Sequence, residues 1–286
     1  MPIEPKLSKM IMYGVVLKCL DPVLTIACCL AHKEPFIIPI QTSEKKSLAE
    51  IRKEYSAKSF SDHMMLLQVF QAWQKSRQGK YERQFCRTNF INSATMEQIL
   101  NTRAQLLGHL RATGFVQARK YYDIKFLNTN SDNWAVVKAA IVASSYPSVC
   151  RLDKEFMTLR TEKENKVAFH PSSCLKTEIS CLHKPSIAQI EFLKKVPSEW
   201  MIYEEKSRVG PWCFIRVVTF VTPVAVALFG GSIRNTKPMV DPTPMVELTS
   251  DSDSENEACS KPINNSNRKT FAVDDWNRFD LDGQTA

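Results

Sequence analysis

The hydrophobic pattern of the sequence changes at Tyr146-Pro147, and this change limits the fold more than any other feature. Before it, residues 43–145 contain few prolines, several helix-start signals and apolar residues at helical spacing. After it, short β-branched or aromatic runs alternate with polar turns and with turns that contain glycine or proline. The sequence therefore predicts an α+β protein of several modules, in which a helical bundle precedes a β-rich part.

Three helices stand out in the first part. The stretch FSDHMMLLQVFQAW offers Ser61 or Asp62 as N-cap, NSATMEQILNTRAQLLGHLRATGF ends near Gly114, and NTNSDNWAVVKAAIVASSYP offers Ser131 or Asp132 as N-cap. The apolar residues expected to face inward are Met65, Leu66, Val69, Phe70 and Trp73 in the first helix and Met96, Ile99, Leu100, Leu106, Leu107 and Leu110 in the second. The expected exposed side of the second helix carries Asn101, Arg103, Gln105, His109 and Arg111.

Residues 14–31, GVVLKCLDPVLTIACCLA, are almost entirely apolar, but Lys18 and the pair Asp21-Pro22 interrupt them. A membrane span needs about 20 unbroken apolar residues, and a signal peptide needs a continuous apolar region before its cleavage site. We therefore expect no membrane partner and two short buried helices, with Asp21 as N-cap of the second and Pro22 at its first position. Its buried stripe is Val23, Ile26, Ala27 and Leu30.

The β-rich part predicts a small barrel of five strands. The expected strands are VCRLDKEFMTLRTE, KVAFHP, WMIYEEKS, CFIRVVTFVTP and VAVALFGG, with Gly230-Gly231 closing the last. Residues 235–270 are rich in Pro, Ser, Asn and acidic residues, which predicts a disordered linker. The aromatic residues of FAVDDWNRF predict that the chain docks back onto the barrel after residue 270.

The charge distribution points to a polyanionic partner. The formal net charge is +8, but residues 241–286 contain ten Asp or Glu and four Lys or Arg, so this tail carries −6 and residues 1–240 carry +14. A basic body with an acidic tail is typical of nucleic-acid-binding proteins, although lysines spread over solvated faces give the same balance.

The sequence lacks the common catalytic and metal-binding patterns. No GxxxxGK[ST], GxSxG, HExxH or EF-hand pattern occurs, and none of the nine cysteines forms a CxxC pair. We expect a reducing compartment, the cytoplasm or else the nucleus. Cys174, Cys181, His170 and His183 do not match a common zinc spacing, so buried thiols and a structural His170 are favoured over a metal or catalytic site. The chain is therefore predicted not to be an enzyme, with no cofactor of its own.

An ordered series of motifs resembles the region that follows the two RecA-like lobes of DEAH/RHA-type RNA helicases. The series is KMIMYGVVLKCLDPVLTIA, EPFIIP, FSDHMMLLQVFQAW, FCRTNFINSATMEQILNTRAQL, VVKAAIVASSYP, VAFHPSS and WMIYEE, and the resemblance covers about residues 3–234. Within the family, QLLGHLRATGFVQAR, NTNSDNWAVVKAA and DSDSE followed by VDDW look most like the branch that carries a YTH domain. That branch is linked to N6-methyladenosine recognition and to meiosis.

The resemblance implies a set of modules. These are a winged-helix remnant (1–42), a ratchet-like helical bundle (43–145), an OB-fold (146–234), a disordered acidic Ser-rich linker (235–270) and a C-terminal segment that docks on the OB-fold (271–286). The RecA-like lobes, which bind ATP and Mg²⁺ and move 3′ to 5′ along RNA, would then be the partner of this chain. We expect a fragment or a degenerate relative, with part of the apolar run 14–31 exposed because its usual neighbour is absent.

The resemblance also implies a channel for single-stranded RNA. Its expected contacts are Asn89, Thr95, Asn101, Arg103 and Gln105 in the bundle, and Ser207, Arg208 and Arg216 around the barrel loop EEKSRVGPW. In the family this loop usually reads like HExxxTSKEYIR, from which Gly210-Pro211 departs. Trp212 could stack on a base or pack on the barrel, and His63 is favoured as a structural residue.

The tail contains one further motif, VELTSDSDSE. Val246, Glu247, Leu248 and Thr249 precede acidic residues and serines, an order that resembles a SUMO-interacting motif and predicts regulatory protein partners. A merely solubilising linker is the favoured alternative.

Two functions remain open at this point. The first is a single-stranded RNA-binding accessory region of a DEAH/RHA-type 3′-to-5′ ATP-dependent RNA helicase. The second is a non-enzymatic interaction scaffold, from a degenerate helicase relative, that acts in RNA regulation. Arg103, Arg208 and Arg216 discriminate between them, because RNA binding would depend on these residues and a scaffold would not.

Overall fold

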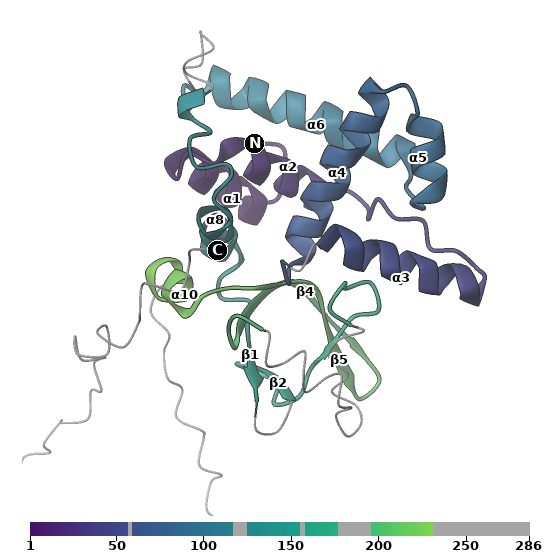
Figure 1. Cartoon of the computed structure of the whole chain (residues 1–286). Helices are drawn as coiled ribbons and strands as arrows, with labels where there is room; N and C mark the ends of the chain where they lie inside the picture. The colour runs from purple at the N-terminus through teal and green to yellow at the C-terminus, as the bar shows by residue number, and fades with distance from the viewer. Residues whose placement is uncertain (57–58, 117–124, 155–157, 177–195, 231–286) are drawn as a thin grey trace, which may run out of the picture. The chain divides into compact units, whose positions relative to one another are not determined.

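The computed structural model describes residues 1–56, 59–116, 125–154, 158–176 and 196–230. Its helices are α1 (Pro5–Val16), α2 (Leu20–Ala31), α3 (Thr42–Ser56), α4 (Asp62–Gln78), α5 (Glu82–Thr88), α6 (Ser93–Ala112), α8 (Trp134–Ser145) and α10 (Pro223–Phe229). Its strands are β1 (Val149–Asp153), β2 (Thr158–Thr161), β3 (Ala168–Phe169), β4 (Trp200–Val209) and β5 (Trp212–Phe220). The predicted order of a helical part followed by a five-stranded sheet is confirmed (Figure 1).

Several sequence predictions concern residues outside those ranges. They are the disordered linker 235–270, the docking segment 271–286, the SUMO-interacting motif at Val246, Glu247, Leu248 and Thr249, and the residues Cys181 and His183. All of these stay predictions.

The strands form one curled sheet in the order β2-β1-β4-β5-β3. The pairs β2–β1, β1–β4 and β4–β5 are antiparallel, and β3 runs parallel to β5. An isolated bridge between Leu159 and Val167 brings the β2 edge toward the segment that leads into β3. The sheet therefore curls into a half-barrel, as expected for an OB-fold.

One predicted strand is wrong. The residues VAVALF of this segment lie in helix α10, and the fifth strand comes instead from VCRLDKEFMTLRTE, which holds both β1 and β2. The Thr222 side chain accepts a hydrogen bond from the Ala225 N–H (3.3 Å), and Pro223 occupies the first turn. Because of this local start signal, the segment forms a helix, although its alternating β-branched residues favour a strand.

Helix α2 lies at the centre of the helical part and contacts α1, α4, α6 and α8. It begins after Cys19, so the predictions of Asp21 as N-cap and of Pro22 at the first helical position are both wrong. Both residues lie within the first turn, where the Asp21 carboxylate interacts favourably with the helix dipole. Of the predicted stripe, Val23, Ile26 and Ala27 are fully buried, whereas Leu30 is only partly buried. Burial extends beyond that stripe, because α2 packs on several sides.

The run 14–31 is exposed in part, as expected, but this part is small. Of its large apolar side chains, only Val16 is mainly exposed, at 71%. The other helices of this chain cover most of the run, which the resemblance places against a separate domain. No described helix is both long and apolar enough to cross a bilayer.

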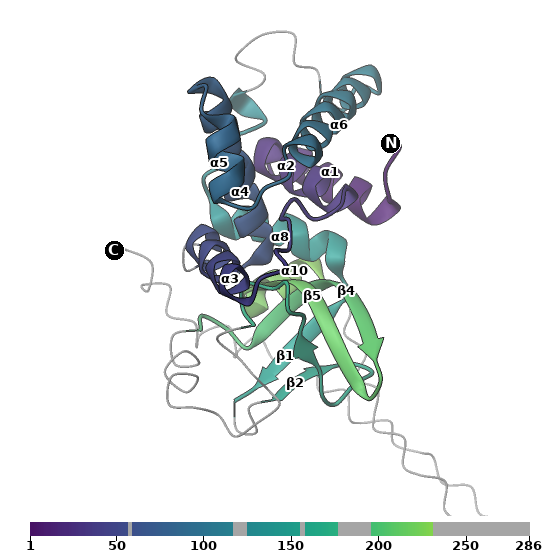
Figure 2. The ribbon, with the colours of Figure 1, turned by 90° about the vertical axis from the view of Figure 1, so that its right-hand side faces the viewer.

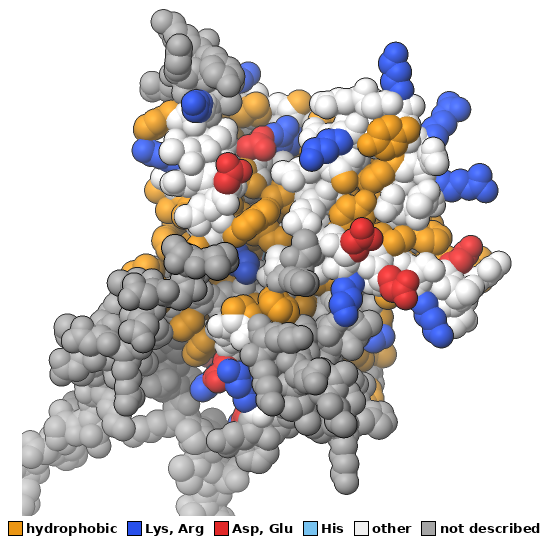
Figure 3. Space-filling view, in the orientation of Figure 1, with side chains coloured by type: hydrophobic (Ala, Val, Ile, Leu, Met, Phe, Trp, Pro, Cys, Tyr) orange, Lys and Arg blue, Asp and Glu red, His pale blue; other side chains and the backbone are white. Residues whose placement is uncertain are grey.

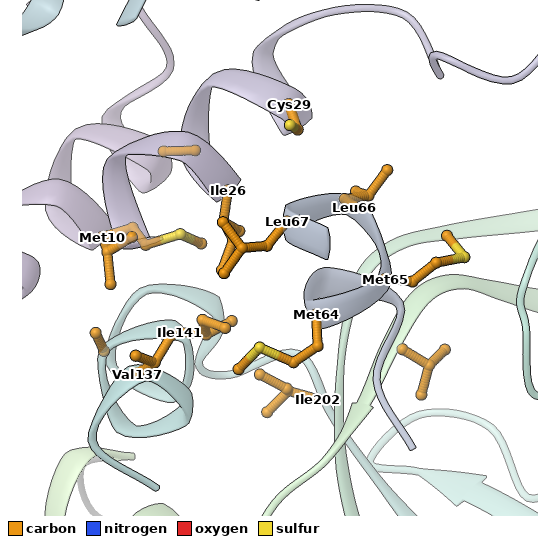
Figure 4. Close-up of a cluster of buried hydrophobic side chains, with 14 of the residues drawn as sticks. Met10, Ile26, Cys29, Met64, Met65, Leu66, Leu67, Val137, Ile141 and Ile202 are labelled. Atoms are coloured by element: carbon orange, nitrogen blue, oxygen red, sulfur yellow. The ribbon is translucent and has the colours of Figure 1, made fainter. Parts of the chain in front are cut away.

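The hydrophobic core continues from the helices into the sheet. Figure 4 shows Met10 of α1, Ile26 of α2 and Met64 of α4 close to Ile141 of α8 and Ile202 of β4. All five side chains are fully buried. Figures 1 and 2 show α4 and α8 reaching the sheet, and both contact it, α4 at β5 and α8 at β4. The bundle and the half-barrel therefore share one core.

Two helical glycines give a test of the α1–α2 packing. A Cβ added at Gly14 would lie 2.9 Å from Val23 Cγ1, whereas one at Gly108 would meet no atom within 4 Å. We expect Gly14→Ala to lower the free energy of unfolding by about 1–3 kcal/mol, because it overpacks the contact between two helices. Gly108→Ala is the control and should raise it by about 1 kcal/mol, because alanine favours the helix. Urea denaturation measures both, and equal effects would contradict the packing argument.

Candidate nucleic-acid interface

The longest exposed feature of the sheet is the outer half of the β4–β5 hairpin. Residues 205–212 are all exposed, and the strands pair up to Val209 and Trp212. Gly210 has φ +59 at the first position of the two-residue turn, as in a type II′ turn, and Pro211 follows it. The departure from the family pattern at Gly210-Pro211 thus builds a tight turn, and the predicted loop residues Ser207 and Arg208 lie on a strand.

The hairpin carries the chemistry that a single-stranded nucleic acid needs. Arg208 has a side chain that is 62% exposed and pairs with Glu164 at 2.6 Å. Trp212 is 43% exposed and lies next to the turn. A guanidinium for phosphate and an indole for base stacking therefore lie within one strand pair. They lie on its opposite faces, because Arg208 pairs with Cys213 and Trp212 pairs with Val209 in the register of the two strands.

Arg216 lies deeper on the same hairpin. Its guanidinium pairs with Glu205 across the strands at 3.3 Å and with Glu34 at 3.7 Å, and its side chain is only 33% exposed. Glu34 also pairs with the buried Arg52 of α3. Burial raises the pKa of Glu34, and the charges of Arg52 and Arg216 oppose this rise. Arg216 thus belongs to a charge network that ties the helical part to the sheet, and the sequence reading missed Arg52 and Glu34.

A cavity of about 80 Å³ lies beside this network. Its lining includes Glu34, Asp62, Glu205 and Arg216. Three carboxylates against one guanidinium do not favour a phosphate group, so we assign no anion site to this cavity.

The predicted contacts on α6 divide between opposite sides of the helix. At 100° per residue, Asn101 and Gln105 share one side and Arg103 lies on the other. Asn101 and Gln105 are exposed, whereas the Arg103 guanidinium pairs with the Asp21 carboxylate of α2. Arg103 therefore ties α6 to α2, and Asn101 and Gln105 remain the candidates for RNA contact on this helix.

Asn89 and Thr95 serve the local structure at the start of α6. The Asn89 side chain donates to the Phe85 carbonyl at 2.9 Å and accepts from the Tyr55 hydroxyl at 3.2 Å. Thr95 is only 9% exposed, and its N–H donates to the Asn92 side chain, which caps α6. The hydrogen bonds of Asn89 and the burial of Thr95 explain why both residues occur here without invoking a ligand.

The motif FSDH forms the joint between α4 and the sheet. Ser61 caps α4 by accepting from the Met64 N–H at 3.1 Å. Asp62 accepts hydrogen bonds from the Ser173 hydroxyl and from the N–H groups of Cys174 and Val218, each at 2.8 Å. His63 lies between Thr219 Oγ1 (2.7 Å) and Glu204 Oε1 (3.1 Å). All three residues of this joint are buried, which supports the structural interpretation of His63.

The strand geometry of β5 fits this joint. Val217 has φ +51, an uncommon conformation for a β-branched residue, and the β4–β5 register is interrupted between Arg216 and Val218. Asp62 takes the N–H of Val218 in place of a ladder partner. A side chain from α4 thereby takes the place of one backbone hydrogen bond between the strands.

The described histidines and cysteines show no metal constellation. Within the described ranges, no group of three or more His, Cys, Asp or Glu residues has metal-binding geometry. Cys174 is buried, which raises its pKa well above the usual value. The His170 ring contacts the Ser172 hydroxyl at 2.8 Å beside Phe214, and burial lowers its pKa. These positions fit the predicted structural roles of Cys174 and His170.

Two family models match the chain. The first, described as the helicase associated domain (HA2), ratchet-like, covers residues 4–66, and the second, the oligonucleotide/oligosaccharide-binding (OB)-fold, covers residues 137–233. An ATP-dependent DNA/RNA helicase DHX36 from Bos taurus is 34% identical over 241 residues, which are 82% of this chain and 22% of the relative. The chain is homologous to the C-terminal helicase-associated and OB-fold regions of DEAH-box RNA helicases.

Two further relatives agree with this placement. The DExH-box ATP-dependent RNA helicase DExH1 from Arabidopsis thaliana is 27% identical over 239 residues, which are 83% of this chain and 22% of the relative. The protein benign gonial cell neoplasm from Drosophila melanogaster is 27% identical over 250 residues, which are 82% of this chain and 19% of the relative. The chain thus spans about a fifth of the length of these relatives. The ratchet-like match includes most of residues 1–42, and the winged-helix boundary stays a prediction.

Proposed function

We propose that this chain is a single-stranded RNA-binding accessory region that works with the RecA-like lobes of a 3′-to-5′ ATP-dependent RNA helicase. The observation that carries the proposal is the exposed β4–β5 hairpin, which presents Ser207, Arg208 and Trp212 on a sheet that matches the OB-fold. ATP and Mg²⁺ would bind those lobes, and this chain would contribute to holding the strand.

Of the three predicted arginines, Arg208 would lose the least stabilisation if its guanidinium left its carboxylate partner to bind an RNA phosphate. Its pair with Glu164 lies on the surface, where such pairs contribute only about 0–1 kcal/mol. Arg103 and Arg216 are 25% and 33% exposed and hold elements together. We therefore assign phosphate contact to Arg208, with Trp212 stacking on a base and Asn101 and Gln105 of α6 as further contacts.

The test is the affinity for a labelled oligouridine, measured by fluorescence anisotropy at two salt concentrations. We expect Arg208→Gln to weaken binding about 2- to 10-fold and to reduce the salt slope by about 0.7, the loss of one contact to a single strand. Arg160→Gln is the matched control, because Arg160 also lies on the sheet and pairs with Asp153 at 3.3 Å. An unchanged slope for Arg208→Gln would contradict the assignment.

The alternative function is a protein-interaction scaffold in RNA regulation. The observation that favours it is that Arg103, Arg208 and Arg216 each pair with a carboxylate of this chain. On this alternative, RNA binding is absent even at low salt. The SUMO-interacting motif at Val246–Thr249 would then supply a site for a regulatory protein, and a labelled 240–260 peptide titrated with SUMO tests it.

We also propose the finer placement that the sequence suggests. The likeness to the YTH-containing branch connects the chain with methylated adenosine and meiosis. All seven cysteines within the described ranges are buried and no two of them form a disulfide, which suits a reducing compartment such as the cytoplasm or the nucleus.

A further inference from the structure

The turn between α4 and α5 carries a dense group of cations, which we call the basic corner: Lys75, Arg77, Lys80, Arg83 and Arg87. All five side chains are exposed. Residues 75–88 contain these five basic residues and one acidic residue, so the segment has a net charge of +4, half of the +8 of the whole chain. Figure 3 shows Lys and Arg side chains over this end of α4 and α5.

Few of these cations are paired with a carboxylate. The one acidic residue of the segment, Glu82, accepts hydrogen bonds from the Trp73 indole N–H at 2.9 Å and from the Ser93 hydroxyl at 2.7 Å. Arg77 has a distant surface pair with Glu97 at 3.6 Å. Among the residues that the structure describes, no carboxylate lies within 4.0 Å of the Lys75, Lys80, Arg83 or Arg87 cation.

An aromatic ring lies in the middle of the basic corner. Tyr81 is 51% exposed, and its ring packs on Gly79, where an added Cβ would lie 2.4 Å from Tyr81 Cε1. The missing side chain of Gly79 thus lets the ring lie against the backbone. The exposed part of the ring forms a surface on which a base can stack.

The backbone of the turn holds Lys80 in an unusual position. The Lys80 N–H donates to the Arg77 carbonyl (3.1 Å) and the Tyr81 N–H to the Ser76 carbonyl (3.0 Å), which is a Schellman motif. Lys80 has φ +60 at the position where glycine is the usual residue. A lysine here is unfavourable for the backbone and adds a charge next to Tyr81.

We propose that the basic corner binds the phosphate backbone of a single-stranded nucleic acid while Tyr81 stacks on a base. The inference extends the proposed RNA-binding function to a second surface, separate from the β4–β5 hairpin. Three arginines and a half-exposed ring match phosphate and base chemistry. An acidic protein would need an apolar interface core, and between residues 41 and 114 Tyr81 is the only large hydrophobic side chain among those described that is mainly exposed.

The test variant is the full chain with Lys80→Gly, Arg83→Gln and Arg87→Gln. Lys80→Gly suits the backbone of the turn, so the melting temperature should not fall because of that change. We expect at least a 5-fold loss of affinity for a labelled 20-residue oligouridine at low salt and a salt slope smaller by about 2, the release expected for three contacts. Lys33→Gln, Lys45→Gln and Lys46→Gln form the matched control, since these exposed lysines remove the same charge elsewhere.

The outcomes separate this surface from the hairpin. Losses in both the corner variant and an Arg208→Gln/Trp212→Ala variant support two binding surfaces. A loss in the corner variant alone supports the basic corner and contradicts the hairpin as a binding site. A loss in an Arg208→Gln/Trp212→Ala variant with normal binding by the corner variant overturns the basic corner and leaves the proposed function intact. Equal losses in the corner and control variants also overturn it, because net charge would then explain the result. Ultraviolet crosslinking to 5-iodouridine RNA should label the peptide that contains Tyr81.

Discussion

Replacing Asp62 by alanine should lower the free energy of unfolding by about 4 kcal/mol. The Asp62 carboxylate accepts from the Ser173 hydroxyl and from the Cys174 and Val218 N–H groups, all at 2.8 Å and all buried. The substitution would leave these three donors unpaired, and each buried unpaired donor costs about 1–3 kcal/mol, reduced where water or small shifts replace the bond. Urea denaturation followed by tryptophan fluorescence measures the change.

The matched control is Asp132→Ala. Asp132 is exposed just before α8, and the N-cap of α8 is Asn133 rather than the predicted Ser131 or Asp132. Removal of the Asp132 side chain should therefore change the stability by less than about 0.5 kcal/mol. A loss at Asp62 no larger than the loss at Asp132 would show that the joint between α4 and the sheet does not stabilise the fold.

The second large effect concerns Glu204 and the dependence of stability on pH. Burial alone would raise the pKa of Glu204, but the hydrogen bond and charge of His63 together with Lys6 lower it to about 2. Glu204 also accepts from the Ser145 hydroxyl at 2.5 Å. Its carboxylate therefore has partners on α1, α4 and α8.

The sign of the pH effect follows from the lowered pKa. The usual value of 4.5 applies to the unfolded chain, so between about pH 5 and pH 2 the unfolded state binds more protons than the folded state. The stabilisation is complete above about pH 5 and is lost as the pH falls toward 2. A pKa lowered to about 2 corresponds to about 3 kcal/mol.

Glu204→Gln should therefore lower the stability at neutral pH by about 3 kcal/mol and flatten its decline in acid. Chemical denaturation at about pH 3, 5 and 7 measures both effects. Glu205→Gln is the neighbouring control, because the Glu205 side chain is 65% exposed and should behave like the unmodified chain. A Glu204 variant with the full acid dependence of the unmodified chain would disprove the assignment.

The sequence predicted those parts of the fold that depend on near neighbours. Ser61 was identified as a possible cap of α4 because its bond to the Met64 N–H spans only three residues. Met96, Ile99, Leu106 and Leu110 are buried on α6 as their spacing indicates, although Leu100 and Leu107 are only partly buried. The cap of α10 by Thr222 is also a local signal, but the alternation of valine and alanine led to the prediction of a strand.

The site was harder to predict because its contacts join distant segments. The bond from Val218 to Asp62 spans 156 residues, and the Arg103–Asp21 pair spans 82. No local pattern indicates that these side chains meet, so Arg103 looked like a free cation on a solvated helix. Helical geometry alone could have separated Arg103 from Asn101 and Gln105. The basic corner was readable as a charge run, but only the structure shows Tyr81 on Gly79.

The joint at Ser61, Asp62 and His63 limits how far the chain can be truncated before the barrel fails to fold. A polypeptide of residues 146–230 alone would contain every described strand, yet it would lack the acceptor for Val218 and Cys174 and the histidine that faces Glu204. Such a truncated barrel would have unpaired polar groups and the bare apolar surface around Ile202. We therefore expect that the OB-fold, although a recognisable sequence module, does not fold as an autonomous unit and that its smallest soluble form includes α4.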